Sequence, residues 1–205
     1  MSPRPAIDHI RKPQILRAAA EVITERGLGA TRIADIAERA GTSAPAVLYW
    51  FESRERLLTE ALIADENLFA EQLDALLEPL GSARERLLTL LEKTVSDGDL
   101  SLWIELWARS LHDADSSDER RRLDLAWRER IAAIVREGQE GGEFEPALDA
   151  DAFAIEFAAL IDGLGVQVTL GDRDVTVERM LDMLVQFADL QLATSLRGTL
   201  EGAVG

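Results

Sequence analysis

Cysteine is absent from this 205-residue chain, and histidine is nearly absent, with only His9 and His112. The lack of cysteine excludes disulfide bonds and thiolate metal sites, and it is consistent with a reducing compartment. Neither histidine belongs to an HExxH motif, a nucleophile elbow or a phosphate-binding loop, so a serine nucleophile would have no evident base. These absences argue against an enzyme and against a bound metal or other cofactor.

Long hydrophobic runs are also scarce. The N-terminal stretch MSPRPAIDHIRKPQ lacks the apolar segment of a secretory signal. The longest apolar run, FAIEFAALIDGLGVQVTL, contains Glu156 and Asp162, which favours a buried helix over a membrane span. We therefore expect a cytoplasmic protein without a membrane partner.

Positive charge is in short supply, but it is unevenly distributed. The chain has 22 Lys and Arg against 38 Asp and Glu, a net charge of −16. Residues 1–56 contain nine basic and seven acidic residues (+2), which leaves 13 basic and 31 acidic residues (−18) for residues 57–205. An acidic body disfavours non-specific binding to phosphates, so any contact with DNA should be confined to the first 56 residues.

Within those 56 residues the apolar positions repeat at helical spacing. A first helix should end at Gly27, and a second should run from a cap at Thr31 to Gly41. Ser43 can cap a third helix, in which Pro45 is tolerated because the first turn does not need its N–H group. Short helices joined by a glycine turn form a helix-turn-helix pattern.

The third helix contains two adjacent aromatic residues, Tyr49 and Trp50. On a helical projection the core-facing arc consists of Ala44, Val47, Leu48 and Phe51. Tyr49 and Trp50 then point outward, where a phenol can donate a hydrogen bond to a phosphate. The alternative is that both rings pack on the next helix or on the second domain.

Residues 15–58, ILRAAAEVITERGLGATRIADIAERAGTSAPAVLYWFESRERLL, resemble the DNA-binding domain of the TetR family of transcriptional regulators. The shared features are a first helix ending in Glu-Arg-Gly, the segment ATRIADIAERAG, the cluster that ends at Phe51, and ESRERLL. The resemblance implies that DNA is faced by Thr31, Arg32, Ser43, Ala44, Pro45, Ala46, Tyr49 and Arg54.

Two of these positions have particular implications. Arg54 stands where the family usually has lysine and would bind a phosphate. Leu48 stands where a tyrosine is common, so that phosphate contact is either absent or taken over by Tyr49. Because the helix lacks Arg, Asn and Gln, we expect specificity to come from Thr42, alanine contacts with thymine methyl groups, Arg32 and DNA shape.

The rest of the chain predicts further helices at 53–78, 82–96, 99–112, 117–138, 150–170 and 174–196. The segment DADSSDERRRLD starts like a calcium loop but lacks the required glycine and the final glutamate, so we interpret it as a polar loop entering a helix. The predicted fold is all-α, with a three-helix DNA-binding domain at 1–56 and a larger helical ligand-binding and dimerisation domain at 57–205.

The last two predicted helices are apolar on more than one face, which suggests pairing with a second copy. Gly163 and Gly165 would permit close approach of helices. The segments SLWIELWARSL, AWRERI, GEFEPALDADAFA and LIDGLGVQVTL resemble the C-terminal domain of the BetI-like branch of the family, which implies a homodimer formed through a four-helix bundle. The candidate interface residues are Leu160, Leu164, Val168, Met183 and Phe187.

A ligand site is predicted around the tryptophans of the middle helices. The candidates are Trp103, Glu105, Trp107, Trp127 and Phe157. Glu105, Glu156 and Asp162 would favour a cation, with aromatic rings adding cation–π attraction. Alternatively, the tryptophans are ordinary core residues.

Together these patterns predict a DNA-binding regulator that responds to a small molecule of unknown identity. As a homodimer it would place two helices in successive major grooves of a pseudo-palindromic site, and a ligand would release it by shifting the helix at 53–78. Repression is the expected mode, with activation as a possibility. The competing hypothesis is a helical adaptor that binds protein through its acidic surface and shows no DNA binding.

Overall fold

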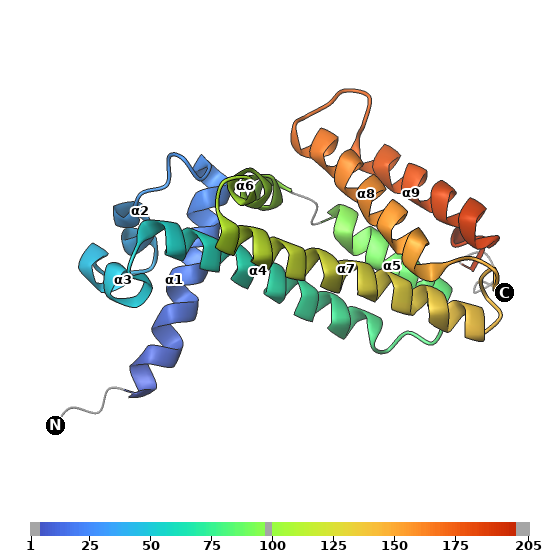
Figure 1. Cartoon of the computed structure of the whole chain (residues 1–205), viewed down its shortest axis with the longest axis horizontal. Helices are drawn as coiled ribbons and strands as arrows, with labels where there is room; N and C mark the ends of the chain where they lie inside the picture. The colour runs from blue at the N-terminus through green and yellow to red at the C-terminus, as the bar shows by residue number, and fades with distance from the viewer. Residues whose placement is uncertain (1–4, 97–99, 200–205) are drawn as a thin grey trace. The chain divides into compact units, whose positions relative to one another are not determined.

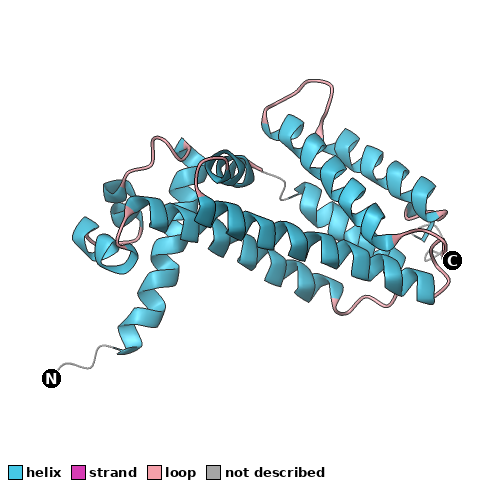
Figure 2. Ribbon diagram, viewed as in Figure 1, coloured by secondary structure: helices cyan, strands magenta, loops and turns pink. Residues whose placement is uncertain are grey.

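A computed structural model describes residues 5–96 and 100–199, with side chains for residues 11–96 and 100–198. Within these ranges every regular element is a helix, as Figures 1 and 2 show. The all-α prediction is therefore confirmed. The chain divides into two compact units, the first formed by residues up to Ala70 with Ser101–Arg120, the second by Glu71–Leu100 with Arg121 onward.

The first unit contains the predicted helix-turn-helix segment. Its helices are α1 (Pro5–Arg26), α2 (Ile33–Arg39), α3 (Ala44–Phe51), the first part of α4 (Arg54–Leu77), α6 (Ser101–Ser110) and the start of α7 (Ala114–Glu140). Helix α1 packs against α2 and α6, and α2 packs against α3. The core of this unit includes Ile15, Ala19, Ile23, Ile36, Val47, Phe51, Leu57 and Leu58.

The turns of this unit follow the predicted glycines. Gly27 and Gly41 adopt φ values of +75° and +62°, a left-handed conformation that favours glycine, directly after α1 and close after α2. The predicted cap of α2 is wrong by one residue. Arg32 is the N-cap, and its backbone N–H donates to the Asp35 carboxylate at 3.3 Å, while Thr31 is buried just before the helix.

The second unit contains the rest of α4 and α7 together with α5 (Ala83–Ser96), α8 (Ala150–Thr169), α9 (Val177–Leu192) and a short 3₁₀ helix, η1 (Arg197–Thr199). Helix α9 packs against both α5 and α8. Both glycines were expected to permit close approach of helices. A Cβ on Gly165 would lie 2.6 Å from the side chain of Leu100, which precedes α6, and 3.6 Å from Met180 on α9. Nothing lies within 4 Å of a Cβ built on Gly163.

Most helix limits agree with the predicted ranges to within a few residues, and the exceptions have identifiable causes. Helix α7 starts at Ala114, three residues early, because the Asp113 carboxylate accepts hydrogen bonds from the N–H and hydroxyl of Ser116. The segment interpreted as a polar loop entering a helix is thus helical from its second residue, and only Asp113 remains outside the helix. Helix α9 is shorter than predicted, since Thr176 caps its start and Ala193 turns left-handed at its end. Residue 99, the predicted start of the helix now seen as α6, lies outside the described residues.

Two further predictions concern the apolar helix near the C-terminal end and the domain boundary at residue 56. Among the described residues, α8 is long and apolar enough to cross a membrane by length and composition, and it buries Phe153, Phe157, Ile161 and Leu164 within the second unit. The first compact unit extends beyond residue 56, so it does not coincide with the predicted DNA-binding domain. The functional division at residue 56 stays a prediction.

Candidate DNA-binding and effector sites

Helix α3 is built as the sequence predicts for a recognition helix. The Ser43 hydroxyl accepts a hydrogen bond from the Ala46 N–H at 3.4 Å, and Pro45 lies in the first turn. Val47 and Phe51 are fully buried and anchor the helix to the first unit. Leu48 was predicted to face the core, but it is 42% exposed, so that prediction is wrong.

The two aromatic residues of α3 behave differently. Tyr49 is 81% exposed, in agreement with an outward-facing phenol. Trp50 is half-buried, and its ring meets the Tyr49 ring edge-on at a centroid distance of 5.7 Å. The indole therefore supports the phenol from one side, and the phenol points away from the protein.

The other predicted DNA contacts lie on the first turn of this helix or before it in the chain. Arg32, Ser43 and Pro45 are exposed, and Thr42, Ala44 and Ala46 are half-buried. A cleft of about 160 Å³ lies beside Thr42, lined by Arg11, Gln14, Ile15, Ala40, Gly41 and Thr42. These groups together form a surface of small side chains, hydroxyls and arginines.

The side chains of Thr31 and Arg54 form hydrogen bonds within the protein. Thr31 is 1% exposed, and its hydroxyl donates to the Gly27 carbonyl at 2.8 Å. The Arg54 guanidinium donates through Nε to the Thr31 carbonyl at 2.9 Å and through Nη2 to the Leu28 carbonyl at 2.5 Å. In this arrangement both side chains organise the loop before α2.

Several basic residues of the segment 1–56 are also engaged in ion pairs. Arg39 bridges Glu21 and Glu25, which raises the pKa of its guanidinium and joins α2 to α1. Lys12 pairs with Glu60 at 2.7 Å and lies over the Phe51 ring. In contrast, Arg11, Arg17 and Arg32 have exposed side chains and form no ion pair with the side chains that the structure describes. Of these, Arg11 lines the cleft beside Thr42 and Arg32 is the N-cap of α2, so both can supply positive charge to a ligand at this surface.

The predicted effector residues divide between the two units. In the first unit, Trp103 and Trp107 lie one turn apart on α6, with ring centroids 5.8 Å apart at a 44° interplanar angle. Glu105 does not join them, because its carboxylate accepts a hydrogen bond from the Leu28 N–H at 3.0 Å. Residues two apart on a helix point to nearly opposite sides, which explains the separation.

Sequence analysis missed an acidic residue beside these indoles, Glu66 on α4. The Trp103 indole N–H donates to its carboxyl, and burial raises the Glu66 pKa to about 8, with the neighbouring Asp65 also raising it. A signal was available, since Glu66 shares a helical face with Leu62, Phe69 and Leu73. A carboxyl on the apolar face of a helix indicates a specific role.

The remaining effector candidates lie in the second unit. Phe157 is fully buried in a stack with Phe153 and Phe187, with ring centroids 5.0 to 6.0 Å apart, so it is part of that unit's core. Trp127 is half-buried on α7. Burial and the nearby Asp124 raise the Asp162 pKa to about 6, while Arg128 opposes them. Glu156 is exposed.

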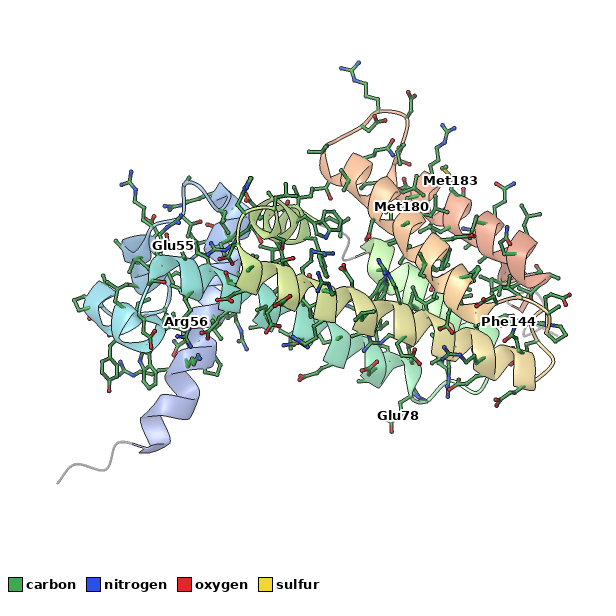
Figure 3. All side chains as sticks on the ribbon, in the orientation of Figure 1. Glu55, Arg56, Glu78, Phe144, Met180 and Met183 are labelled. Atoms are coloured by element: carbon green, nitrogen blue, oxygen red, sulfur yellow. The ribbon has the colours of Figure 1, made fainter. Side chains whose placement is uncertain are left out.

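The residues predicted to form the dimer interface differ in their solvent exposure. Leu164 is buried, Phe187 belongs to the aromatic stack, and Leu160 and Val168 are half-buried. Met183 is 38% exposed, whereas its neighbour Met180 on α9 is buried (Figure 3). The outer surface of α8 and α9 also exposes Ile155 by 52% and Leu190 by 74%, neither of which was predicted.

Comparisons with known proteins agree with this geometry. The family model of TetR-type bacterial regulatory proteins matches residues 15–61, and that of the C-terminal domain of BetI-type transcriptional repressors matches residues 83–193. The chain is 29% identical over 202 residues to the HTH-type transcriptional regulator BetI of Escherichia coli strain K12, covering 94% of this chain and 99% of that protein. Identity to BetI of strain SE11 is 30% over 181 residues, with coverage of 83% and 88%.

Solved structures give the same result. A transcriptional regulator from Saccharomonospora viridis in complex with choline is 34% identical, with a TM-score of 0.81 and coverage of 88% of this chain and 96% of that one. A TetR-family regulator from Rhodococcus sp. is 28% identical, with a TM-score of 0.74 and coverage of 89% and 98%. These families are regulators and not enzymes, and none of the similar proteins supports the adaptor hypothesis. The chain therefore belongs to the TetR family of DNA-binding transcriptional regulators, with a C-terminal domain of the BetI type.

Proposed function

We propose that this regulator is a repressor that binds a pseudo-palindromic operator as a homodimer and is released by a small organic cation. The two copies of α3 would enter successive major grooves, about 34–36 Å apart or a multiple of that distance. The observation that carries the DNA-binding part is the exposed face of α3, where an 81% exposed Tyr49 projects from a rigidly anchored helix. Because a regulator of transcription must reach the DNA, we expect the protein to be cytoplasmic.

The DNA contacts that we propose are the accessible members of the predicted set, Arg32, Thr42, Ser43, Ala44, Pro45, Ala46 and Tyr49. The alanines and Pro45 would allow the helix backbone to approach the base edges, and Tyr49 and Ser43 would donate to phosphates. The cleft beside Thr42 contains the exposed Arg11, which suits a further phosphate. We assign Thr31 and Arg54 to the loop before α2 and not to the DNA interface.

For the effector we propose a quaternary ammonium compound such as choline. The regulator from Saccharomonospora viridis, whose structure is a complex with choline, is 34% identical in sequence to this chain. In this chain, the Trp103 and Trp107 rings provide π faces, and Glu66 provides a carboxyl whose pKa is raised by burial and by the neighbouring Asp65. A cation between these groups would gain cation–π attraction from the rings. It would also stabilise the ionised form of Glu66, which burial destabilises.

The dimer surface that we propose is the exposed apolar side of α8 and α9. Of the predicted residues, Met183 is exposed enough to contact a second copy directly, and Leu160 and Val168 are half-buried. Ile155 and Leu190 extend this surface. We propose that Leu164 and Phe187 support it from within the subunit.

Selection of genomic DNA fragments on the purified protein tests the DNA-binding proposal. An enriched inverted repeat should be bound steeply against salt, and choline should weaken that binding. To lower operator affinity tenfold, the effector must favour the released state by about 1.4 kcal/mol. If no fragment is enriched, even after unfolding and refolding to remove a co-purified effector, the operator-binding proposal fails.

The pH dependence of choline binding tests the effector site. The cation requires ionised Glu66, whose pKa of about 8 keeps it protonated in the free protein at lower pH. Choline affinity should therefore rise with pH by up to about tenfold per unit and level off above pH 8. Glu66→Gln should bind weakly at every pH. An equal pH slope in the variant would place the cation elsewhere.

A further inference from the structure

The loop between α1 and α2 sets the position of the helix-turn-helix, and it is fixed by side chains from distant parts of the sequence. It begins at Gly27, passes through Leu28 and Thr31, and ends at the N-cap Arg32. Its residues belong to no regular element, so their backbone groups need partners from elsewhere. The Thr31 hydroxyl supplies one local partner by donating to the Gly27 carbonyl.

Besides a long backbone hydrogen bond from the Thr31 N–H to the Leu28 carbonyl at 3.4 Å, the loop has partners on α6 and α4. The Leu28 N–H donates to Glu105 Oε1 at 3.0 Å across a sequence separation of 77 residues. The Leu28 carbonyl accepts from Arg54 Nη2 at 2.5 Å, and the Thr31 carbonyl accepts from Arg54 Nε at 2.9 Å. Both polar groups of the Leu28 backbone are thus held by charged side chains. Hydrogen bonds to charged groups are stronger than those between neutral groups.

Helix α6 joins this loop to the indole pair. Glu105 projects toward the loop from one side of α6, and Trp103 and Trp107 lie on roughly the opposite side of the same ten-residue helix. Arg54 is the first residue of α4, the helix that also carries Glu66. The two residues that fix the loop are therefore on the two helices that supply the indoles and the half-buried Glu66 carboxyl.

We propose that Glu105 and Arg54 are positioning residues for operator binding, which hold the loop 27–32 and through it α2 and α3, without contacting DNA. This inference rests on the proposed operator binding. A ligand that moves α6 or α4 would alter these hydrogen bonds directly. Glu105 thus acts between the effector and the DNA, and Arg54 orients the protein rather than a phosphate.

The sign of the effect distinguishes positioning from electrostatics at Glu105. Removal of a carboxylate from a DNA-binding protein should strengthen DNA binding if only charge matters. We expect the opposite for Glu105→Ala, about fivefold weaker operator binding, because the Leu28 N–H loses its partner. Glu105→Gln removes the charge but keeps an acceptor oxygen, so it should bind within about twofold of the wild type or more tightly.

The salt dependence of binding makes the same distinction at Arg54. A lost phosphate contact lowers the slope of log K against log salt by about 0.9. We expect Arg54→Ala to weaken operator binding severalfold with the slope unchanged. Arg54→Lys should be nearly as weak, because an ammonium group keeps the charge but cannot reproduce the two-pronged donation of a guanidinium. Circular dichroism melts of each variant confirm that it is folded.

Amide hydrogen exchange tests the contact without DNA. The Leu28 amide should exchange slowly in the wild type and in Glu105→Gln, and faster in Glu105→Ala. The inference is overturned for Glu105 if Glu105→Ala binds the operator as tightly as the wild type. It is overturned for Arg54 if Arg54→Lys binds normally while Arg54→Ala lowers the slope of log K against log salt by about 0.9. A wild-type protein that selects no operator would instead contradict the proposed function.

Discussion

Helix α3 and the outer face of α8 and α9 both expose apolar side chains, but in different surroundings. Tyr49 on α3 is 81% exposed in a segment with a net charge of +2, whereas Leu190 on α9 is 74% exposed in the remainder, with a net charge of −18. Acidic surroundings repel phosphates and leave an apolar face for another protein surface. Exposure alone does not identify a partner, and here the difference in segment charge supports our proposal of a DNA-binding face on α3 and a self-association face on α8 and α9.

The largest effect should follow from breaking the self-association face. Leu190→Glu places a charge within the proposed interface, and we expect it to convert the dimer into a monomer. Operator affinity should then fall by about 100-fold or more, because one half-site is bound without the second. Light scattering coupled to size-exclusion chromatography and an operator titration measure the two quantities.

The matched control is Leu111→Glu, which changes an equally exposed leucine (78%) in the first unit. This variant should remain dimeric and bind the operator normally, apart from the small cost of an added negative charge. A dimeric Leu190→Glu protein would show that α9 does not form the interface.

A smaller effect should follow at the DNA-binding face. Tyr49→Phe removes only the hydroxyl, and we expect about tenfold weaker binding, the value of a hydrogen bond to a charged acceptor. Because a phosphate contact does not depend on sequence, operator and random DNA should lose affinity equally. Competition titrations on both DNAs measure this.

The oligomeric state provides the control for Tyr49→Phe, since the variant should remain a dimer. Discrimination between operator and random DNA that falls in the variant would assign the hydroxyl to a base edge. Unchanged affinity for both DNAs would remove Tyr49 from the interface.

The contrast between these regions also explains which features were predictable from sequence. The third helix followed from local chemistry, because Ser43 caps its own helix and Val47 and Phe51 are one turn apart. Leu48 was assigned wrongly, since a helix of eight residues buries only a narrow arc against its neighbours. Helical periodicity and turn signals predicted the helices beyond residue 58, and family resemblance supplied their expected roles. Local capping residues such as Asp113 and Thr176 set the observed helix limits.

The candidate site was less predictable where it depends on tertiary contacts. Glu105 was grouped with the tryptophans of its own helix, but its partner, Leu28, lies 77 residues away. Arg54 was expected on a phosphate, yet its guanidinium meets two carbonyls 23 and 26 residues earlier. No sequence spacing encodes such pairs, because they exist only once α6 and the start of α4 lie beside the loop 27–32 in the folded protein.

The smallest expected effect comes from removing one helix cap in each of the two regions. Ser43 caps α3, and Asp149 caps α8 by accepting from the N–H groups of Asp151 and Ala152. Alanine at either position should cost about 1 kcal/mol of unfolding free energy. Only Ser43→Ala should also weaken operator binding, by roughly threefold, because only α3 faces DNA.

Ser43→Asp separates the two roles of that serine. A carboxylate caps a helix as well as a hydroxyl does, so the melting temperature should return to the wild-type value. Operator affinity should instead fall below that of Ser43→Ala, because the new charge faces phosphates. If Asp restored affinity together with stability, Ser43 would serve only as a cap, and the DNA-binding face would begin later on α3.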